Sequence, residues 1–461
     1  MKFCTIFVLH SLMFLILLRA LYFAYFSLTN LIEFLKITTP MKRLIFPFII
    51  FFLMAGRLWA SQILIPMDES QKNHLKSYGI AYWILKNNDT EVEWLLNYRG
   101  GAFMFPQTQK FENELVIRGV SYQVISEGDA AQIRAEVSSP DVNMDVVKLQ
   151  KPPRIAVYSP KTVQPWDDAV TLAMTYAEIP YDLVFDEEVM NGKLPEYDWL
   201  HLHHEDFTGQ MGKFWNQSSQ PWYQAQLRED KKNAAKFGFD KVSKLKLNVA
   251  KKIKEFVAGG GYMFAMCTAT DTYDIALAAD GLDIVDAYYD GDGYDNAADS
   301  KLDFSNTFAF QNFNLIYHPQ VIEFSNIEAY PNESRPVQEE NDFFNLFQFS
   351  AKWDPIPTML TQNHETTIHG FMGQTTSFKK QVLKPEVTVL GENRSLNEAR
   401  YIHGTFLKGF FSFYAGHDPE DYRHFVNEEP TDLNLHPNSP GYRLILNNVL
   451  FPAAKKKKQK T

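Results

Sequence analysis

The sequence predicts an α/β protein built on a doubly wound, mostly parallel sheet, with a small N-terminal α/β unit and a long insertion. From Ile155 onward, short apolar runs alternate with amphipathic segments, which is the pattern of parallel strands joined by helices. The amphipathic segment 244–258 ends at Gly259, Gly260 and Gly261, a helix stop that precedes the apolar run 262–266. Apolar and charged residues make up 45% and 22% of the chain, ordinary values for a globular protein.

The first 60 residues contain two hydrophobic stretches that need a separate interpretation. Residues 41–60 combine a basic start, an apolar run and Ala60 before Ser61, which is typical of a secretory signal peptide cleaved after Ala60. We interpret residues 1–40 as a misassigned upstream segment; the alternative is an additional membrane span of about 20 residues. The sequence therefore predicts a periplasmic or otherwise exported protein whose mature chain has no membrane span.

Composition divides the mature chain into two domains and a tail. Lys151, Pro152 and Pro153 mark the boundary, and the alternating pattern dissolves after Gly281 into a region rich in Phe, Asn and Asp. Such a long insertion usually carries a lid, a binding surface or a subdomain. The predicted divisions are a small α/β domain at 61–150, a larger α/β domain at 151–455 with its insertion at 283–400, and a basic tail at 456–461.

Charge and cysteine content exclude two classes of protein. The formal net charge is −10, which argues against a nucleic-acid partner because nucleic-acid binders present a basic face. The two cysteines are Cys4 and Cys267, and the first lies before the predicted cleavage site. One remaining thiol excludes a disulfide framework.

Polar residues follow four of the predicted strands at the end where ligands bind in open α/β sheets. The groups come after the first, third, fourth and last strands of the larger domain. They are Ser159, Lys161 and Asp167; His203, His204, Glu205 and Asp206; Cys267; and His417, Asp418 and Glu420. This convergence is the main sequence argument for a functional site.

Cys267 lies between small residues at a predicted strand-to-helix turn, the position of a nucleophile in several hydrolases. A helix capped by Thr270 or Asp271 would direct its positive end toward the sulfur and favour the thiolate. We therefore assign Cys267 as a candidate nucleophile, His417 as its general base and Glu420 as the orienting acid. The alternative is that Cys267 is a small buried hydrophobic residue.

The remaining polar groups are candidate substrate contacts, with Asp418 a second choice for the orienting acid. The substrate-binding set is His203, His204, Glu205, Asp206 and Asp418. A zinc-like ion at His201 and His203 is an alternative, because alternating strand residues share one face.

No cofactor is required by this interpretation. The run Asp290, Asp292 and Asp295 is rich in carboxylates and glycines and would suit calcium, but it does not have the EF-hand spacing. A polar turn is the alternative interpretation of these residues.

The order of strand, Cys267 turn, helix and late strand ending in His417 and an acid resembles the class I glutamine amidotransferase-like fold, including its trehalose-utilisation-type relatives. The run FFSFYAGHDPEDY is similar to their closing strand. The resemblance covers residues 152–285 and 400–455 and implies a flavodoxin-like parallel sheet with a Cys-His-Glu site. The family's G-x-C-x-G reads A-M-C-T-A here, and its H-P-E reads H-D-P-E.

The runs NYRGGAFMFP and LHLHHEDFTGQ resemble exported Bacteroidota proteins that carry the label asparagine synthetase B. Enzymes of that name use an N-terminal cysteine and an S-G-G-x-D-S loop. The mature chain would begin at Ser61 and contains no such loop. Asparagine synthetase B is therefore an alternative function that rests on the label alone.

Two functions remain open from sequence. The first is a cysteine-dependent hydrolase of an amide- or sugar-related substrate, which would take a small molecule or glycan. The second is a non-catalytic binding or scaffold module of the cell envelope. The insertion and the N-terminal unit would then form its interface with a protein partner.

Overall fold

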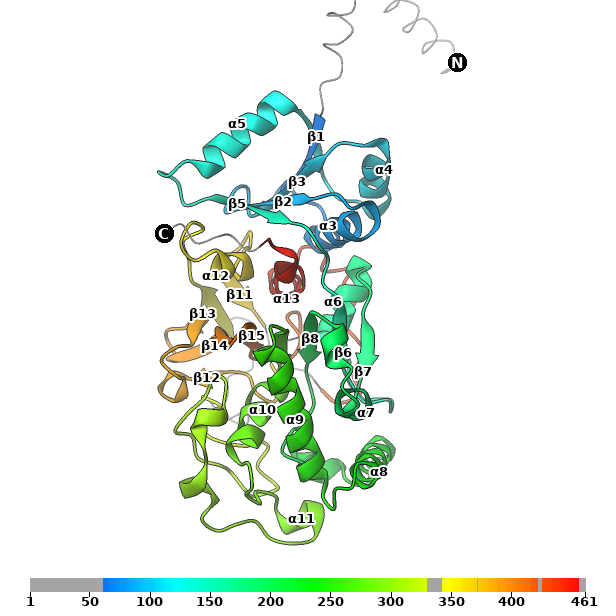
Figure 1. Cartoon of the computed structure of the whole chain (residues 1–461), viewed down its shortest axis with the longest axis vertical. Coiled ribbons are helices and arrows are strands. Elements are labelled where there is room, and N and C mark those ends of the chain that lie inside the picture. The colour runs from blue at the N-terminus through cyan, green and yellow to red at the C-terminus, as the bar shows by residue number, and fades with distance from the viewer. Residues whose placement is uncertain (1–60, 330–341, 371, 422–424, 456–461) are drawn as a thin grey trace, which may run out of the picture. The chain divides into compact units, whose positions relative to one another are not determined.

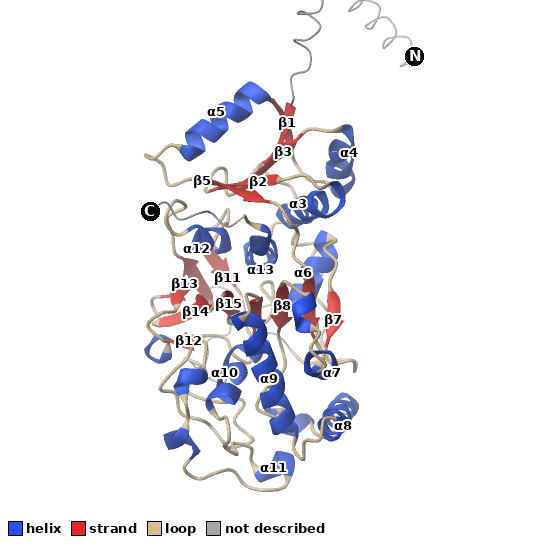
Figure 2. Cartoon of the chain, in the orientation of Figure 1, coloured by secondary structure: helices blue, strands red, loops and turns tan. Residues whose placement is uncertain are grey.

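The computed structural model of the chain describes residues 61–329, 342–370, 372–421 and 425–455. They belong to one compact unit, Ser61–Thr461, which contains two β-sheets (Figures 1 and 2). Strands β1 to β5 form the first sheet and strands β6 to β15 form the second. The division at residue 150 stays a prediction, and the predictions for the first 60 residues and the basic tail from residue 456 lie outside the described residues.

The first sheet is antiparallel throughout, with the strand order β4-β1-β3-β2-β5. Arg99, Gly100 and Gly101 have φ values of 46°, 74° and 90° in the turn between β2 and β3. A turn this short joins antiparallel neighbours. The alternation of strands and helices in residues 61–150 predicts strands crossed over by helices, and that prediction is wrong for this sheet. The elements are β1 (Ser61–Ile65), α3 (His74–Asn88), β2 (Val92–Leu96), β3 (Ala102–Pro106), α4 (Gln109–Arg118), β4 (Gln123–Ser126), α5 (Glu127–Ser138) and β5 (Asp145–Leu149).

The second sheet is mixed, with the order β11-β10-β13-β14-β15-β9-β8-β6-β7 and β12 paired to β14. Only the neighbours β7, β6, β8, β9 and β15 pair in parallel; every other pairing is antiparallel. The strands are β6 (Ile155–Tyr158), β7 (Asp182–Val184), β8 (Trp199–Leu202), β9 (Tyr262–Met266), β10 (Phe343–Leu346), β11 (Thr367–His369), β12 (Phe378–Lys379), β13 (Thr388–Asn393), β14 (Glu398–Phe406) and β15 (Gly409–Tyr414).

The prediction of a doubly wound, mostly parallel sheet is therefore wrong. The predicted insertion at 283–400 supplies β10, β11, β12 and β13, which extend the sheet instead of standing apart from it. The β14–β15 hairpin joins this antiparallel half to the parallel half through β9.

Side chains of the central strands alternate between two hydrophobic cores, one on each face of the sheet. Ile155 and Val157 of β6 pack in a core with α3, α6 and α13, whereas Ala156 and Tyr158 pack in a core with α9 and α10. Burial on both faces explains why these strands are continuous apolar runs. The remaining helices are α6 (Ala169–Ala177), α7 (Asp186–Met190), α8 (Pro221–Lys236), α9 (Val242–Ala258), α10 (Ala269–Ala278), α11 (Ala287–Asp290), α12 (Pro355–Leu360) and α13 (Pro440–Leu450).

Helices α3 and α6 meet closely at Gly79. A Cβ atom built at this position would lie 1.8 Å from the carbonyl oxygen of Ala177. We expect Gly79→Ala to lower the free energy of unfolding by about 2 kcal/mol, because the helices must separate to admit the methyl group. Urea denaturation followed by circular dichroism measures this change.

The matched control for this substitution is Gly128→Ala in α5. A Cβ there would have Ser126 Oγ as its nearest neighbour at 3.6 Å, an ordinary contact. We expect this helix substitution to stabilise the protein by up to about 1 kcal/mol. Equal effects at the two glycines would contradict the close approach at Gly79.

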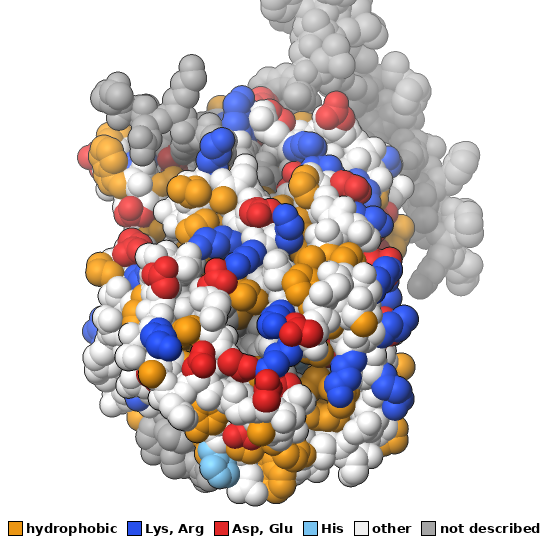
Figure 3. Space-filling model, turned by 60° about the horizontal axis from the view of Figure 1, so that its bottom comes forward, with side chains coloured by type: hydrophobic (Ala, Val, Ile, Leu, Met, Phe, Trp, Pro, Cys, Tyr) orange, Lys and Arg blue, Asp and Glu red, His pale blue; other side chains and the backbone are white. Residues whose placement is uncertain are grey.

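Within the described ranges, no helix combines the length and the apolar character needed to cross a bilayer. On the face shown in Figure 3, acidic and basic side chains are interspersed over the surface.

Candidate functional site

The predicted polar groups follow parallel strands that are neighbours in the second sheet. Strands β6, β8, β9 and β15 lie side by side in parallel, so the segments after Tyr158, Leu202, Met266 and Tyr414 emerge at the same edge. Backbone hydrogen bonds tie these segments together: the N–H of Cys267 donates to the carbonyl of Gly416 at 3.1 Å.

Cys267 occupies a strained turn at the tip of β9. The backbone φ of Cys267 is 48°, in the left-handed region, and Cys267 is only 3% exposed. The backbone N–H of Gln374 donates to Sγ at 3.3 Å, and Thr268 Oγ1 lies 3.7 Å from the sulfur. Burial raises the pKa of the thiol despite these contacts, so Cys267 is a neutral thiol at neutral pH.

The helix after Cys267 begins two or three residues earlier than the sequence predicts. Helix α10 starts at Ala269 and has no side-chain cap. Thr270 Oγ1 instead donates to the carbonyl of Cys267 at 2.6 Å, and Asp271 accepts from Thr375 Oγ1 at 3.0 Å. The expected capping residues therefore fix the turn and the segment that covers it.

Gln374 is one of the site residues that sequence reasoning missed, together with Asp168, Trp166 and Trp222. The side chain of Gln374 accepts from Thr268 Oγ1 at 2.6 Å and donates to the carbonyl of Gly212 at 2.6 Å, so it closes over the Cys267 turn. It comes from the region without periodic pattern, where no sequence signal points to a site.

His417 lies at the tip of β15 and is fully buried. Its Nε2 is 3.2 Å from Nε2 of His204 and 3.1 Å from the carbonyl oxygen of Asp167. Its ring centroid is 4.7 Å from that of His203. The structure thus brings His417 together with the predicted substrate contacts that follow β8.

The two acids after His417 have partners of their own. Asp418 accepts from Tyr442 Oη at 2.5 Å and from the Glu420 N–H at 2.8 Å, and burial raises its pKa. The Glu420 carboxylate lies 3.1 Å from Nδ1 of His436. The roles predicted for Cys267, His417 and Glu420 stay predictions.

His203 and His204 stack on each other, with ring centroids 3.8 Å apart and an interplanar angle of 11°. His204 Nε2 is 2.8 Å from the carbonyl oxygen of Asp167. His203, His204 and His417 each offer one ring nitrogen within 4.8 Å of the other two, a spacing compatible with one metal ion. We call these three residues the histidine cluster.

Asp168 orients the cluster from the start of α6. Its Oδ1 caps the helix by accepting from the Thr171 N–H at 2.9 Å, and its Oδ2 lies 3.3 Å from Nδ1 of His203 and 3.2 Å from Nε2 of His201. Burial would raise the pKa of Asp168, but the charges of His201 and His203 outweigh burial and hold it well below the usual value.

His201 and His203, the predicted zinc pair, also form a group with Asp168 that could hold an ion. Both ring nitrogens of His201 face oxygen atoms, since Nδ1 lies 3.2 Å from the carbonyl of Phe264 and Nε2 faces Asp168. These two contacts orient the His201 ring behind His203.

Glu205 and Asp206 play different parts in the loop after β8. Glu205 Oε2 accepts from the His203 N–H at 3.0 Å, and burial is the main cause that raises the pKa of Glu205 to about 8. Asp206 accepts from the N–H groups of Thr208 and Gly212 at 2.7 and 3.2 Å, so it shapes the loop. Glu205 is therefore protonated at neutral pH and can donate a proton.

A cavity of about 360 Å³ opens beside the cluster at this edge of the sheet. Trp166 and Trp222 line it in an edge-to-face pair 5.1 Å apart, and neither indole Nε1–H has a hydrogen-bond partner among the described residues. The apolar side chains of the lining also include Pro160, Leu172, Phe185, Met211, Phe214 and Val242. Its polar and charged residues are Ser159, Thr162, Gln164, Asp167, Asp168, Thr171, His204, Glu205, Asp206, Gln226, Asp230 and Lys246.

Calcium at Asp290, Asp292 and Asp295 stays a prediction. The side-chain ammonium of Lys241 already lies beside Asp290 and Asp292. The Nζ of Lys241 is 2.9 Å from Asp290 and 2.5 Å from both Asp283 and Asp292. The Asp295 carboxylate accepts from the Asp283 N–H at 3.2 Å.

Comparisons with known proteins place the chain in no family. No protein-family model matches it, and no curated protein matches it. Two cytoplasmic proteins of Salmonella typhimurium align with 66% and 65% of this chain and with 100% and 99% of their own, at 10% and 11% identity and TM-scores of 0.34. A GH42 beta-galactosidase from Bacillus circulans sp. alkalophilus aligns with 57% of this chain and 28% of its own, at 11% identity and a TM-score of 0.25. Similarity this low supports no conclusion about fold family or function.

Proposed function

We propose that this protein is a metal-dependent hydrolase of a small, hydroxyl-rich or amide-bearing substrate. The observation that carries the proposal is the convergence of His203, His204 and His417, whose ring nitrogens lie within 4.8 Å of one another. Three imidazoles with an open fourth position are a recurring ligand set of catalytic zinc.

The spacing of the cluster supports a tetrahedral ion. Two nitrogens bound to one zinc at about 2.1 Å each lie about 3.4 Å apart, and Nε2 of His204 and Nε2 of His417 are 3.2 Å apart. The Asp168 carboxylate faces Nδ1 of His203, so Nε2 of His203 would bind the metal. A carboxylate behind a ligating histidine is the common support of such sites.

The cavity supports a polar substrate beside the metal. Trp166 and Trp222 line the cavity, and their rings offer apolar faces to a sugar-like ring. Glu205 lines the same cavity and places a carboxyl group beside the substrate, where it could transfer a proton. A bound zinc-type ion would lower the pKa of water to about 7 and so supply the nucleophile.

This proposal gives Cys267 a structural role. The thiol is buried, neutral and covered by Gln374, whereas a cysteine nucleophile acts as an accessible thiolate. Export to the periplasm remains compatible with the proposal and is untested.

Metal binding tests the proposal directly. The chelator-treated full-length protein should bind one Zn²⁺ per chain in isothermal titration calorimetry, and Co²⁺ in its place should give the visible absorption of tetrahedral cobalt. We expect His204→Ala and His417→Ala each to weaken Zn²⁺ binding by roughly 100-fold or more. His318→Ala, an exposed histidine outside the cluster, is the control and should leave the affinity unchanged.

A second variant separates metal support from folding. Asp168→Asn keeps a good N-cap for α6 but removes the negative charge behind His203, so Zn²⁺ affinity should fall about 10- to 100-fold with the fold intact. The proposal fails if the protein binds no Zn²⁺ or Co²⁺, or if cluster variants bind as well as the parent. A small-molecule binding protein without catalysis would then be the better interpretation of the cavity.

A further inference from the structure

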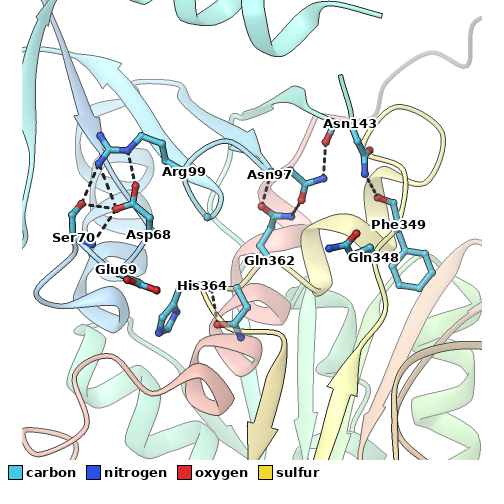
Figure 4. Close-up of a pocket in the computed structure, with 12 residues that line it drawn as sticks. Asp68, Glu69, Ser70, Asn97, Arg99, Asn143, Gln348, Phe349, Gln362 and His364 are labelled. Carbon is cyan, nitrogen blue, oxygen red and sulfur yellow. Dashed lines mark hydrogen bonds and ion pairs between the residues drawn. The ribbon is translucent and has the colours of Figure 1, made fainter. Parts of the chain in front are cut away.

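A second cavity, of about 720 Å³, shares no lining residue with the cavity beside the histidine cluster. It lies where the loop after β1 and the β2–β3 turn meet the segments that follow β10 and α12 (Figure 4). Its volume is within the range of small-molecule sites, about 300–1,000 Å³. Its lining residues are Asp68, Glu69, Ser70, Asn97, Arg99, Gly100, Asn143, Gln348, Phe349, Gln362, Asn363 and His364.

Amide side chains on one side of this cavity are held in a fixed network. The Asn97 N–H donates to Gln362 Oε1 at 2.8 Å, and Gln362 Nε2 donates back to Asn97 Oδ1 at 2.7 Å. Asn143 Nδ2 donates to the carbonyl of Phe349 at 3.0 Å, while its Oδ1 accepts from the Ala351 N–H at 2.8 Å. The wall is therefore ordered before a ligand arrives, which lowers the entropic cost of binding.

On the other side, Arg99 and Asp68 neutralise each other, and Glu69 is the remaining charged residue of the lining. Arg99 Nε donates to Asp68 Oδ2 at 2.7 Å and its Nη2 donates to Ser70 Oγ at 3.1 Å. Figure 4 shows this group and the amide network on opposite sides of the cavity. Because the guanidinium already has its carboxylate, the cavity offers no unpaired cation to an anionic ligand.

His364 is a neutral ring in the wall of the cavity, and its ring N–H is used in a hydrogen bond to the backbone of Asn438. Arg443 Nη1 lies 3.2 Å from its Nδ1, and a guanidinium only donates, so Nδ1 accepts and Nε2 carries the proton. Burial and the neighbouring charges of His74 and Arg443 lower the pKa of His364 to about 3, so the ring stays neutral.

We propose that this cavity binds a neutral oligosaccharide. The partly buried ring of Phe349 offers an apolar face for a sugar ring, and the primary amide of Gln348 presents donors and an acceptor together, as a hydroxyl group does. Gln348 is exposed at the rim and has no hydrogen bond to the described residues, so its amide is available to the ligand. The site does not depend on the histidine cluster.

Ligand-observed NMR with defined oligosaccharides tests this inference. The probes are cellotriose, maltotriose, mannotriose and N-acetylchitotriose, each added to the full-length protein at neutral pH. We expect at least one to bind, and Phe349→Ala and Gln348→Ala each to weaken that binding roughly tenfold. Phe425→Ala, an exposed phenylalanine outside the cavity, should leave the affinity unchanged. His204→Ala should leave it unchanged as well, even where metal binding is lost.

The inference is overturned if none of the four probes binds, or if the bound probe is insensitive to both cavity substitutions. Binding of a tripeptide or of inorganic phosphate with the same sensitivity, in place of the sugars, would also overturn it. Thermal unfolding of each variant confirms that a weakened interaction does not come from an unfolded protein.

Discussion

Replacing Lys246 by methionine should lower the free energy of unfolding by about 3–5 kcal/mol. Lys246 Nζ lies 3.0 Å from both carboxylate oxygens of Asp186 and 3.5 Å from Asp230 Oδ1, and all three residues are buried. The hydroxyl of Tyr158 completes the group at 3.2 Å. Without the ammonium, two carboxylates remain buried with no counter-charge. Chemical denaturation at pH 7 measures the loss.

Two comparisons sharpen this prediction. Lys244 is on the same helix but exposed, with its Nζ 2.7 Å from Asp240, so Lys244→Met should change stability by less than about 1 kcal/mol. The penalty of Lys246→Met should shrink as the pH falls, because protonated carboxyls carry no charge; burial already raises the pKa of Asp230 to about 6. Equal effects at the two lysines would show that the buried network contributes little.

Asp274→Ala should destabilise the protein by about 3 kcal/mol and loosen the segment that follows α11. The Asp274 carboxylate accepts three backbone N–H groups, from Phe308 and Ala309 at 2.7 Å and from Phe310 at 3.0 Å. Removing it leaves three buried donors without a partner. Limited proteolysis should show new cleavage near these residues, together with a lower midpoint of unfolding.

Asp280→Ala is the control for this substitution. Asp280 follows the same helix, is half-exposed and pairs with Lys251 at 2.8 Å on the surface. We expect it to change the free energy of unfolding by less than about 1 kcal/mol and to leave the proteolysis pattern unchanged. New cleavage in the control would mean that the segment opens without losing the Asp274 anchor.

The parallel strands were predictable because burial on both faces gives an unmistakable apolar run. Val157, Leu200 and Phe264 lie in such runs, and each run lies close to an observed strand. The antiparallel half was not predictable. Phe343–Leu346 and Thr388–Asn393 are short and irregular, and their pairing depends on contacts far away in the sequence. The sequence therefore predicted a separate insertion, whereas the strands of this region extend the sheet.

The grouping of His203, His204 and His417 followed from topology alone, since parallel strands end at one edge. Their mutual distances did not follow, because side-chain packing after the strands decides them. The partner of Glu420, which is His436 in the next loop, did not follow from the topology either. Gln374 and Gln362 were invisible for a related reason: a glutamine in an irregular segment carries no pattern until the fold brings it to a partner.

The cover over Cys267 makes this thiol a measure of local opening. Its sulfur is closed off by the backbone and side chain of Gln374, which comes from a segment more than 100 residues further along the chain. An alkylating reagent can reach the sulfur only when that segment lifts, so the labelling rate at Cys267 reports the free energy of lifting it. Cys267 would then serve as a built-in probe of the antiparallel half while the parallel half stays folded.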